Sequence, residues 1–149
     1  MHLEGSFETA APQKVAWEFL LNPNELAPCL PDLQSLDVLS PDSFRAKVKV
    51  GIGPVKGNMD FEFHVTDKIP PTSAKLAGSG RGVGSSVQLQ TKLTLYGLEQ
   101  GCRVQWVADA TVSGIIAGLG SRLLDSTSAR MVEQVVGNFQ TKLAARAKA

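Results

Sequence analysis

The sequence predicts an α+β fold in which a bent antiparallel sheet wraps around one long C-terminal helix. Two observations carry this prediction. Between residues 33 and 112, apolar and polar side chains alternate with a period of two and are interrupted by short turns, as in antiparallel strands with one buried face. From Ile115 to Lys142, apolar residues recur at steps of three or four, which is the period of an amphipathic helix.

The chain begins with an alternating segment, His2–Glu8, which predicts a first strand. Two short helices follow it. Pro12 opens the first helix at a position where its missing N–H group does no harm. Asn22 is the predicted N-cap of the second helix, Pro23 its first residue, and Pro28 ends it.

The alternating region contains a series of predicted strands joined by turns, at Leu36–Leu39, Phe44–Val50, Val55–Thr66, Ala74–Gly78, Val87–Leu95 and Cys102–Val112. The glycine-rich run Gly78–Ser86 is predicted to connect two of them as a mobile or close-packed lip of the sheet. A strand follows this run, whereas a phosphate-binding loop requires a helix at that point, so nucleotide binding is excluded.

Composition indicates one domain, residues 1–149, with a loose tail from about Ala144. The net charge of +1 and the aromatic share of 6% give no reason to expect a nucleic-acid partner. Two cysteines, Cys29 and Cys102, are too few for a disulfide framework or a cysteine-rich metal site. The N-terminal residues lack the apolar segment of a signal peptide, so we expect a reduced, cytoplasmic protein.

Candidate catalytic groups are sparse. Glu62 and His64 lie two residues apart on one strand face, which could form an acid–base pair or half of a metal site. The local pattern offers no third ligand, and this favours an exposed pair without function. Asp109 and Asp125 are a further carboxylate pair, but nothing in the sequence brings them together. We therefore expect no catalytic residues, no metal and no cofactor.

The middle of the long helix, Asp125–Ala129, consists of short side chains between larger ones at both ends. Either a space lies open beneath the helix, or large side chains of the sheet fill it; the helix pattern alone does not decide. If a cavity exists, an apolar lining with a few hydroxyl groups suits a lipophilic small molecule carrying one or two oxygens. The predicted lining residues are Met59, Phe61, Phe63, Leu89, Thr91, Leu93, Val104, Trp106, Leu123, Thr127 and Met131. The predicted entrance loops contain Gly51, Gly53, Gly80, Gly82, Gly118 and Gly120.

Several motifs, in this order, resemble those of the CoxG family of carbon monoxide dehydrogenase subunits: Gly5-Ser6-Phe7, Ala11-Pro12, Pro28-Cys29-Leu30-Pro31, the ten residues Val48–Gly57, Gly78–Gly82 and Leu119–Leu123. The resemblance covers nearly the whole chain and implies the helix-grip fold of the START-like superfamily. It also implies an accessory protein of molybdenum-containing hydroxylases, proposed to tether the enzyme to the membrane or to carry its quinone electron acceptor. The family motifs are glycines and prolines, so the resemblance transfers no catalytic residue.

Longer members of that family carry a C-terminal extension with a hydrophobic membrane segment, which this sequence does not show up to Ala149. We therefore expect at most a weak peripheral contact of Lys142, Arg146 and Lys148 with an anionic membrane surface. Three functions remain open. They are a module that binds a lipophile such as a quinone for a molybdenum hydroxylase, a structural assembly factor for the same enzymes, and a polyketide-cyclase-like enzyme, which would need inward polar groups.

Overall fold

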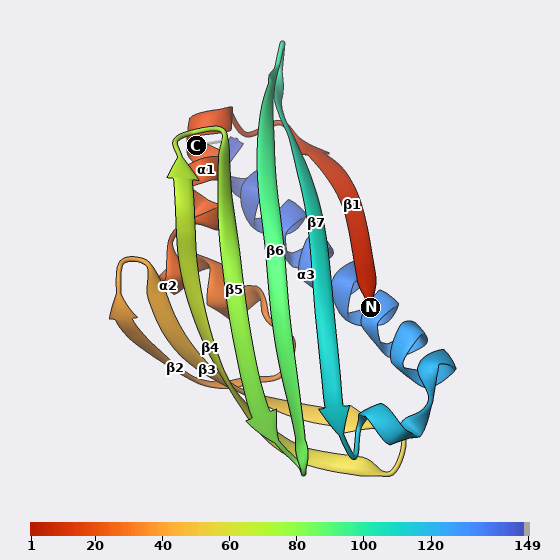
Figure 1. The fold of residues 1–149 in the computed structure, drawn as a ribbon. Coiled ribbons are helices and arrows are strands. Elements are labelled where there is room, and N and C mark those ends of the chain that lie inside the picture. Colours follow the sequence, from red (N-terminus) through yellow and green to blue (C-terminus); the bar gives the residue numbers. More distant parts are fainter. Residues whose placement is uncertain (148–149) are drawn as a thin grey trace.

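The computed structural model describes residues 1–147, which form one curved seven-stranded antiparallel sheet and a set of helices on its concave side (Figure 1). The elements are β1 (His2–Thr9), α1 (Gln13–Leu20), α2 (Pro23–Leu26), η1 (Ala27–Cys29), β2 (Leu33–Ser40), β3 (Ser43–Ile52), β4 (Val55–Ile69), β5 (Ser73–Gly82), β6 (Ser85–Leu98), β7 (Gly101–Gly114), η2 (Ala117–Leu119) and α3 (Ser121–Ala147). The predicted α+β fold is confirmed.

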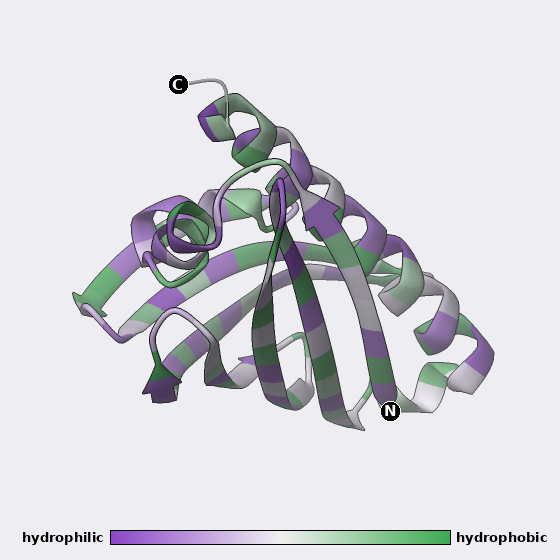
Figure 2. Cartoon of the chain, turned by 90° about the horizontal axis from the view of Figure 1, so that it is seen from above, coloured by the Kyte–Doolittle hydropathy of each residue, from purple (hydrophilic) through white to green (hydrophobic). Residues whose placement is uncertain are grey.

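The strand order is β1-β7-β6-β5-β4-β3-β2, so β1 and β2 are the two edges and β5 is the central strand. Seen from above, the sheet is arched, and hydropathy alternates along its strands as the period-two pattern predicted (Figure 2). The side chain of Asn22 caps α2 by accepting a hydrogen bond from the Asn24 N–H, and Pro23 is the first residue of that helix, both as predicted.

Helix α3 lies on the concave side, near β1 at one end and near η1 at the other. The Ser128 hydroxyl lies 3.1 Å from the Met1 sulfur, and the Asn138 side-chain amide donates to the Cys29 carbonyl at 2.9 Å. Of the tail predicted from about Ala144, the residues that the structure describes are helical, since α3 continues to Ala147. Arg146 holds the last turn: it pairs with Glu25, and its guanidinium lies 5.1 Å from the centroid of an α1 ring, Phe19. Lys148 lies outside the described residues.

The long helix does not run unbroken from Ile115. Residues 117–119 form η2, and Gly120, with φ +99°, precedes α3 in a conformation that favours glycine. The predicted apolar stripe is therefore divided, with Ile116 packed into the sheet before the bend and the later positions on α3. No helix among the described residues is both long and apolar enough to cross a bilayer.

The core consists of three clusters rather than one. The first joins α1, β1, β7 and the C-terminal end of α3 around Phe19, Val104 and Leu143. The second lies beneath η1, around Phe44 and Phe63, and the third lies at the start of α3, around Met59 and Ile116. The buried side chains are therefore divided among these three clusters. The residues in the middle of the inner face of the sheet belong to none of them as buried members.

Candidate ligand-binding face

The middle of the concave side is apolar and only half-buried, although it belongs to the central strands. We call this surface the central inner face and define it by Phe61 of β4, Leu76 of β5, and Leu89, Thr91 and Leu93 of β6. A fully covered sheet would bury such residues almost completely. Solvent therefore reaches the apolar surface between the three core clusters.

The predicted lining residues divide by burial. Four are buried: Met59, Phe63, Val104 and Thr127. Six are half-buried: Phe61, Leu89, Thr91, Leu93, Trp106 and Leu123. Met131 lies one helical turn after Thr127 and stays 43% exposed, so its side chain is not packed. Sequence reasoning left out Leu76, which pairs directly with Thr91 in the sheet register.

Gly78 and Gly80 lie in a strand beneath the aromatic rings of this face and do not form a loop. Both lie within β5, directly opposite Phe63 and Phe61 of β4, and the two aromatic rings lie on them. A Cβ at Gly80 would come 2.4 Å from the Phe61 ring, and one at Gly78 would come 2.8 Å from the Phe63 ring. The glycine-rich connection predicted over Gly78–Ser86 is therefore wrong except at the turn of residues 83–84: β5 continues to Gly82 and β6 begins at Ser85. The glycines of β5 are needed there because flat rings require bare backbone beneath them.

The remaining predicted entrance glycines are placed as follows. Gly53 lies in the β3–β4 turn, Gly118 in η2 and Gly120 directly before α3. Gly51 and Gly82 lie within strands, β3 and β5, so for them, as for Gly80, the loop prediction is wrong. Trp106 lies over another glycine, Gly5 of β1. A Cβ added at Gly5 would come 2.7 Å from the indole ring.

Thr127 supplies a polar group on the helix that covers the sheet. The residue is only 7% exposed, and it is the one buried polar residue of the described chain. The neighbouring hydroxyls have partners: that of Ser126 donates to the Leu123 carbonyl, and that of Ser128 contacts Met1. No hydrogen bond within residues 1–147 involves the Thr127 hydroxyl. Since every fully buried side-chain oxygen and nitrogen of these residues has a partner, the small exposed area of Thr127 includes its hydroxyl.

Thr91 provides a second hydroxyl, on the sheet. It is half-buried on β6, and its hydroxyl likewise has no hydrogen bond within the described residues. An apolar surface with an isolated hydroxyl, such as that of Thr91, is typical of a site that binds an apolar molecule and orients it through a few polar contacts.

The titratable groups of the described residues do not build a catalytic centre here. His2 lies on the exposed side of β1 between Glu4 and Asp109, and these two hydrogen bonds raise its pKa. His64 is exposed and Glu62 half-buried, and the two side chains lie 3.6 Å apart at the surface of the sheet. Residues 1–147 contain no cluster of three candidate metal ligands.

The two cysteines are buried free thiols, and burial raises the pKa of both. Cys29 lies in η1 and Cys102 at the start of β7, within the first core cluster. A raised pKa keeps a thiol protonated and unreactive near neutral pH, which argues against nucleophilic chemistry at either one.

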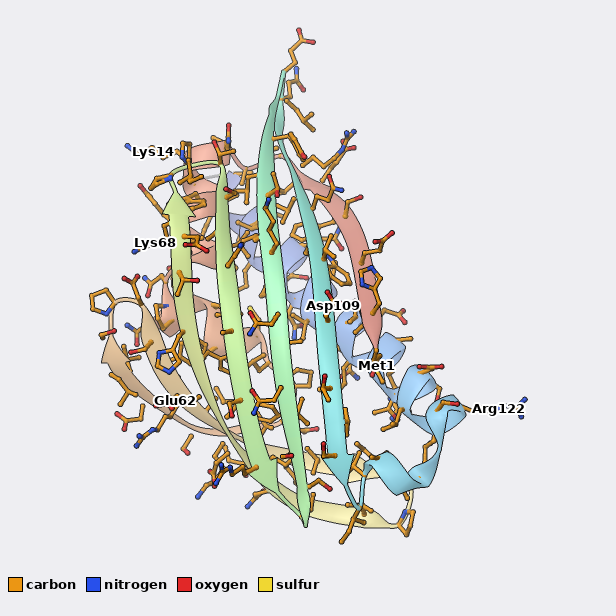
Figure 3. The ribbon with its side chains drawn as sticks, viewed as in Figure 1. Met1, Lys14, Glu62, Lys68, Asp109 and Arg122 are labelled. Carbon is orange, nitrogen blue, oxygen red and sulfur yellow. The ribbon has the colours of Figure 1, made fainter. Side chains whose placement is uncertain are left out.

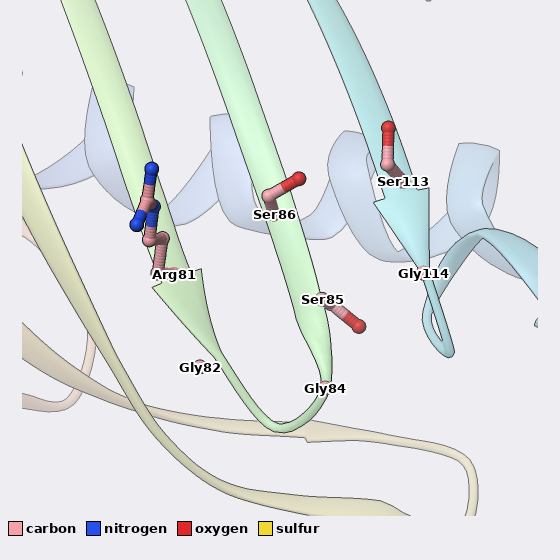
Figure 4. A pocket seen from close by; sticks show the side chains of 7 residues that line it. All are labelled: Arg81, Gly82, Gly84, Ser85, Ser86, Ser113 and Gly114. Atoms are coloured by element: carbon pink, nitrogen blue, oxygen red, sulfur yellow. The ribbon is translucent and has the colours of Figure 1, made fainter.

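Among the surface depressions of the described residues are two open ones that do not lie between the sheet and α3. One is at the β5–β6 turn, lined by residues that include Arg81, Ser86 and Ser113 (Figure 4). The other lies on the outward side of α3, next to Arg130 and Asn138. The central inner face itself is a half-buried apolar surface.

The family model of CoxG, a carbon monoxide dehydrogenase subunit, matches residues 5–144. A conserved protein from Geobacillus kaustophilus has a similar crystal structure, with a TM-score of 0.88 and 27% identity over 97% of this chain and 96% of that one. A START superfamily protein from Mycobacterium smegmatis has a TM-score of 0.71 at 10% identity, over 95% and 96% of the two chains. The latter likeness shows the helix-grip fold alone. No match was found among curated protein sequences.

Proposed function

Because this chain belongs to the CoxG family of carbon monoxide dehydrogenase subunits, we propose that it is an accessory protein that binds a lipophilic small molecule on its central inner face. One observation carries the proposal. The hydroxyl of Thr127 has no partner in the described chain and lies on the helix that covers an apolar, half-buried sheet. A ligand oxygen bound there would replace the water that reaches the small exposed area of this hydroxyl, and such a hydrogen bond contributes about 0.5–1.5 kcal/mol.

The chemistry of the face selects the ligand class. Each Å² of apolar ligand surface that the central inner face buries contributes about 25 cal/mol to the free energy of binding. Phe61 and Phe63 stack with centroids 5.8 Å apart and an interplanar angle of 11°, which presents a flat aromatic surface. Flat aromatic walls and two isolated hydroxyls, those of Thr127 and Thr91, suit a planar apolar ring with one or two carbonyl oxygens. A quinone has this character.

The name of the family, a subunit of carbon monoxide dehydrogenase, supports an enzyme of that type as the partner. We infer that the bound molecule serves a molybdenum hydroxylase of the carbon monoxide dehydrogenase type, as an electron acceptor would. The second candidate function is an assembly factor for the same enzymes that binds no ligand. It is favoured by the burial of Met59, Phe63 and Val104, three of the predicted lining residues, within the packed core. A cyclase-like activity has less support, since the central inner face carries no titratable group.

Quinone titration distinguishes the two. We would use decylubiquinone as the probe and follow the fluorescence of Trp106 in a Trp17→Phe background, so that one indole reports on the face. Saturable quenching is expected. Thr127→Val should weaken binding roughly three- to tenfold, the value of one hydrogen bond.

The matched control is Thr141→Val on the exposed side of α3, where the hydroxyl bonds to the Gly137 carbonyl. It should leave quinone affinity unchanged. An absence of saturable quenching in the wild-type protein would refute ligand binding, and the assembly-factor function would then stand.

A further inference from the structure

One edge of the sheet has no cover. Strand β2 pairs with β3 on one side, and no strand or helix of the described residues lies beyond its other side (Figure 1). The backbone N–H and C=O groups along that outer side therefore have no ladder partner. An edge strand in this condition is a template on which a further strand can pair.

The opposite edge of the sheet, β1, lies against a helix. Met1 stands beside α3 (Figure 3), and its sulfur lies 3.1 Å from the Ser128 hydroxyl. Further along β1, the Phe7 ring lies 6.5 Å from the ring of Phe139 in α3. A helix beside an edge strand is one of the usual means by which proteins prevent edge-to-edge pairing. Strand β2 is therefore the free edge of the sheet.

The sequence of β2 also favours pairing. The strand contains no lysine and no proline, the residues that commonly block an edge, and its Val38 and Leu39 are 38% and 44% exposed. Register shifts against β3 toward both ends of the strand leave residues 35–38 as its regular part. These four residues therefore set the register that an added strand can adopt.

Unpaired charge of both signs lies along this edge, on the outer side of the sheet. Asp37 of β2 stands opposite Arg45 of β3, and Ser35 stands opposite Lys47. Arg45 is already paired with Glu62 of β4, at 3.3 Å (Figure 3). Neither Asp37 nor Lys47 forms an ion pair within residues 1–147. The edge therefore carries one free carboxylate and one free ammonium group.

We propose that β2 pairs antiparallel with β2 of a second copy of the chain, about a two-fold axis through Leu36. Within the regular part, an axis through Leu36 or through Asp37 keeps the opposed residues on the same face of the sheet. An axis through Asp37 opposes two carboxylates, which is unfavourable. An axis through Leu36 places the two leucines together on the inner side and Ser35 of each copy opposite Asp37 of the other.

This register also brings the free charges together. Lys47 is the direct neighbour of Ser35 in the ladder, so it lies two strand spacings, about 10 Å in the backbone, from Asp37 of the second copy. The two side chains point to the same face and carry opposite charges. Because the contact is two-fold symmetric, it occurs twice in the dimer. The second copy thus supplies both the missing ladder partner and the missing counter-charges.

Sedimentation equilibrium and native mass spectrometry of the full chain test the pairing. The wild-type protein should form a dimer whose fraction rises with concentration. Lys47→Glu and Asp37→Lys each replace two attractions across the dimer by two repulsions, so each variant should dimerise about fivefold more weakly. In a mixture of the two variants, opposite charges meet again at both positions. The mixed dimer should therefore exceed both homodimers, which isotope labelling of one variant makes countable.

The matched control is Lys92→Glu, at an exposed position on the outer side of β6, away from both edges. It should dimerise like the wild type, and so should the double variant Asp37→Lys with Lys47→Glu, which restores opposite charges in every pair. Circular dichroism checks that each variant is folded. A wild-type chain that remains monomeric, single variants that dimerise normally, a mixture without excess mixed dimer, or an equal loss with Lys92→Glu would each overturn the proposal.

Discussion

Replacing Gly80 with alanine should displace Phe61 and destabilise the domain. The two residues are paired across β4 and β5, and an added Cβ would stand 2.4 Å from the Phe61 ring, where ordinary contact begins at 3.4 Å. The ring must therefore move by about 1.0 Å, the difference 3.4 − 2.4. It is stacked on Phe63, which is stacked on Phe44 at 5.0 Å between centroids, so the strain spreads along three rings.

Overpacking of this kind costs about 1–3 kcal/mol, which lowers the thermal midpoint of a domain of this size by roughly 3–10 °C. Thermal unfolding followed by circular dichroism measures it. Gly51→Ala is the matched control within β3: nothing lies within 4 Å of its added Cβ. Alanine should be neutral or slightly stabilising there. Phe61→Leu should relieve part of the loss in the double variant. A Gly80→Ala protein as stable as the wild type would refute the placement of Phe61.

Two further predictions concern the edges of the fold. Hydrogen bonds to Glu4 and Asp109 raise the pKa of His2, so its stabilising effect is fully present below the unfolded value of about 6.5 and is lost as pH rises through the raised pKa. His2→Gln should therefore lower the thermal midpoint at pH 6 and leave it unchanged at pH 9; an equal loss at both would contradict this. Arg146→Ala removes the ion pair with Glu25 and the contact with an α1 ring, and should cost about 1 kcal/mol after solvent screening. A double-variant cycle with Glu25→Gln measures the coupling between the two residues, and zero coupling would show that the pair does not hold the last turn of α3.

Much of the architecture could be predicted from local pattern. Alternation identified the inner and outer sides of β3, β4, β6 and β7, because a strand buried on one face must repeat with a period of two. Asn22 and Pro23 predicted the start of α2, since capping depends on residues adjacent in the chain. The predicted lining residues Phe61, Leu89, Thr91 and Leu93 all fall on the partly open face.

The errors occurred where distant residues decide the conformation. Gly78–Gly82 has a composition typical of a loop, yet it is a strand, because Phe61 and Phe63 from β4 lie on it. The sequence contains alternate phenylalanines, Phe61 and Phe63, and alternate glycines, Gly78 and Gly80. Only the register between β4 and β5 shows that they face each other.

The last turn of α3 likewise depends on Glu25, 121 residues away from Arg146 in the chain. Local sequence nevertheless determined most of the strands and helices and which side of each is apolar. Tertiary structure alone decided that the core divides into three clusters and that Thr127 is buried on α3 with no hydrogen bond from its hydroxyl to the described chain. These features depend on strand order, register and helix placement, which arise from contacts between residues far apart in the sequence.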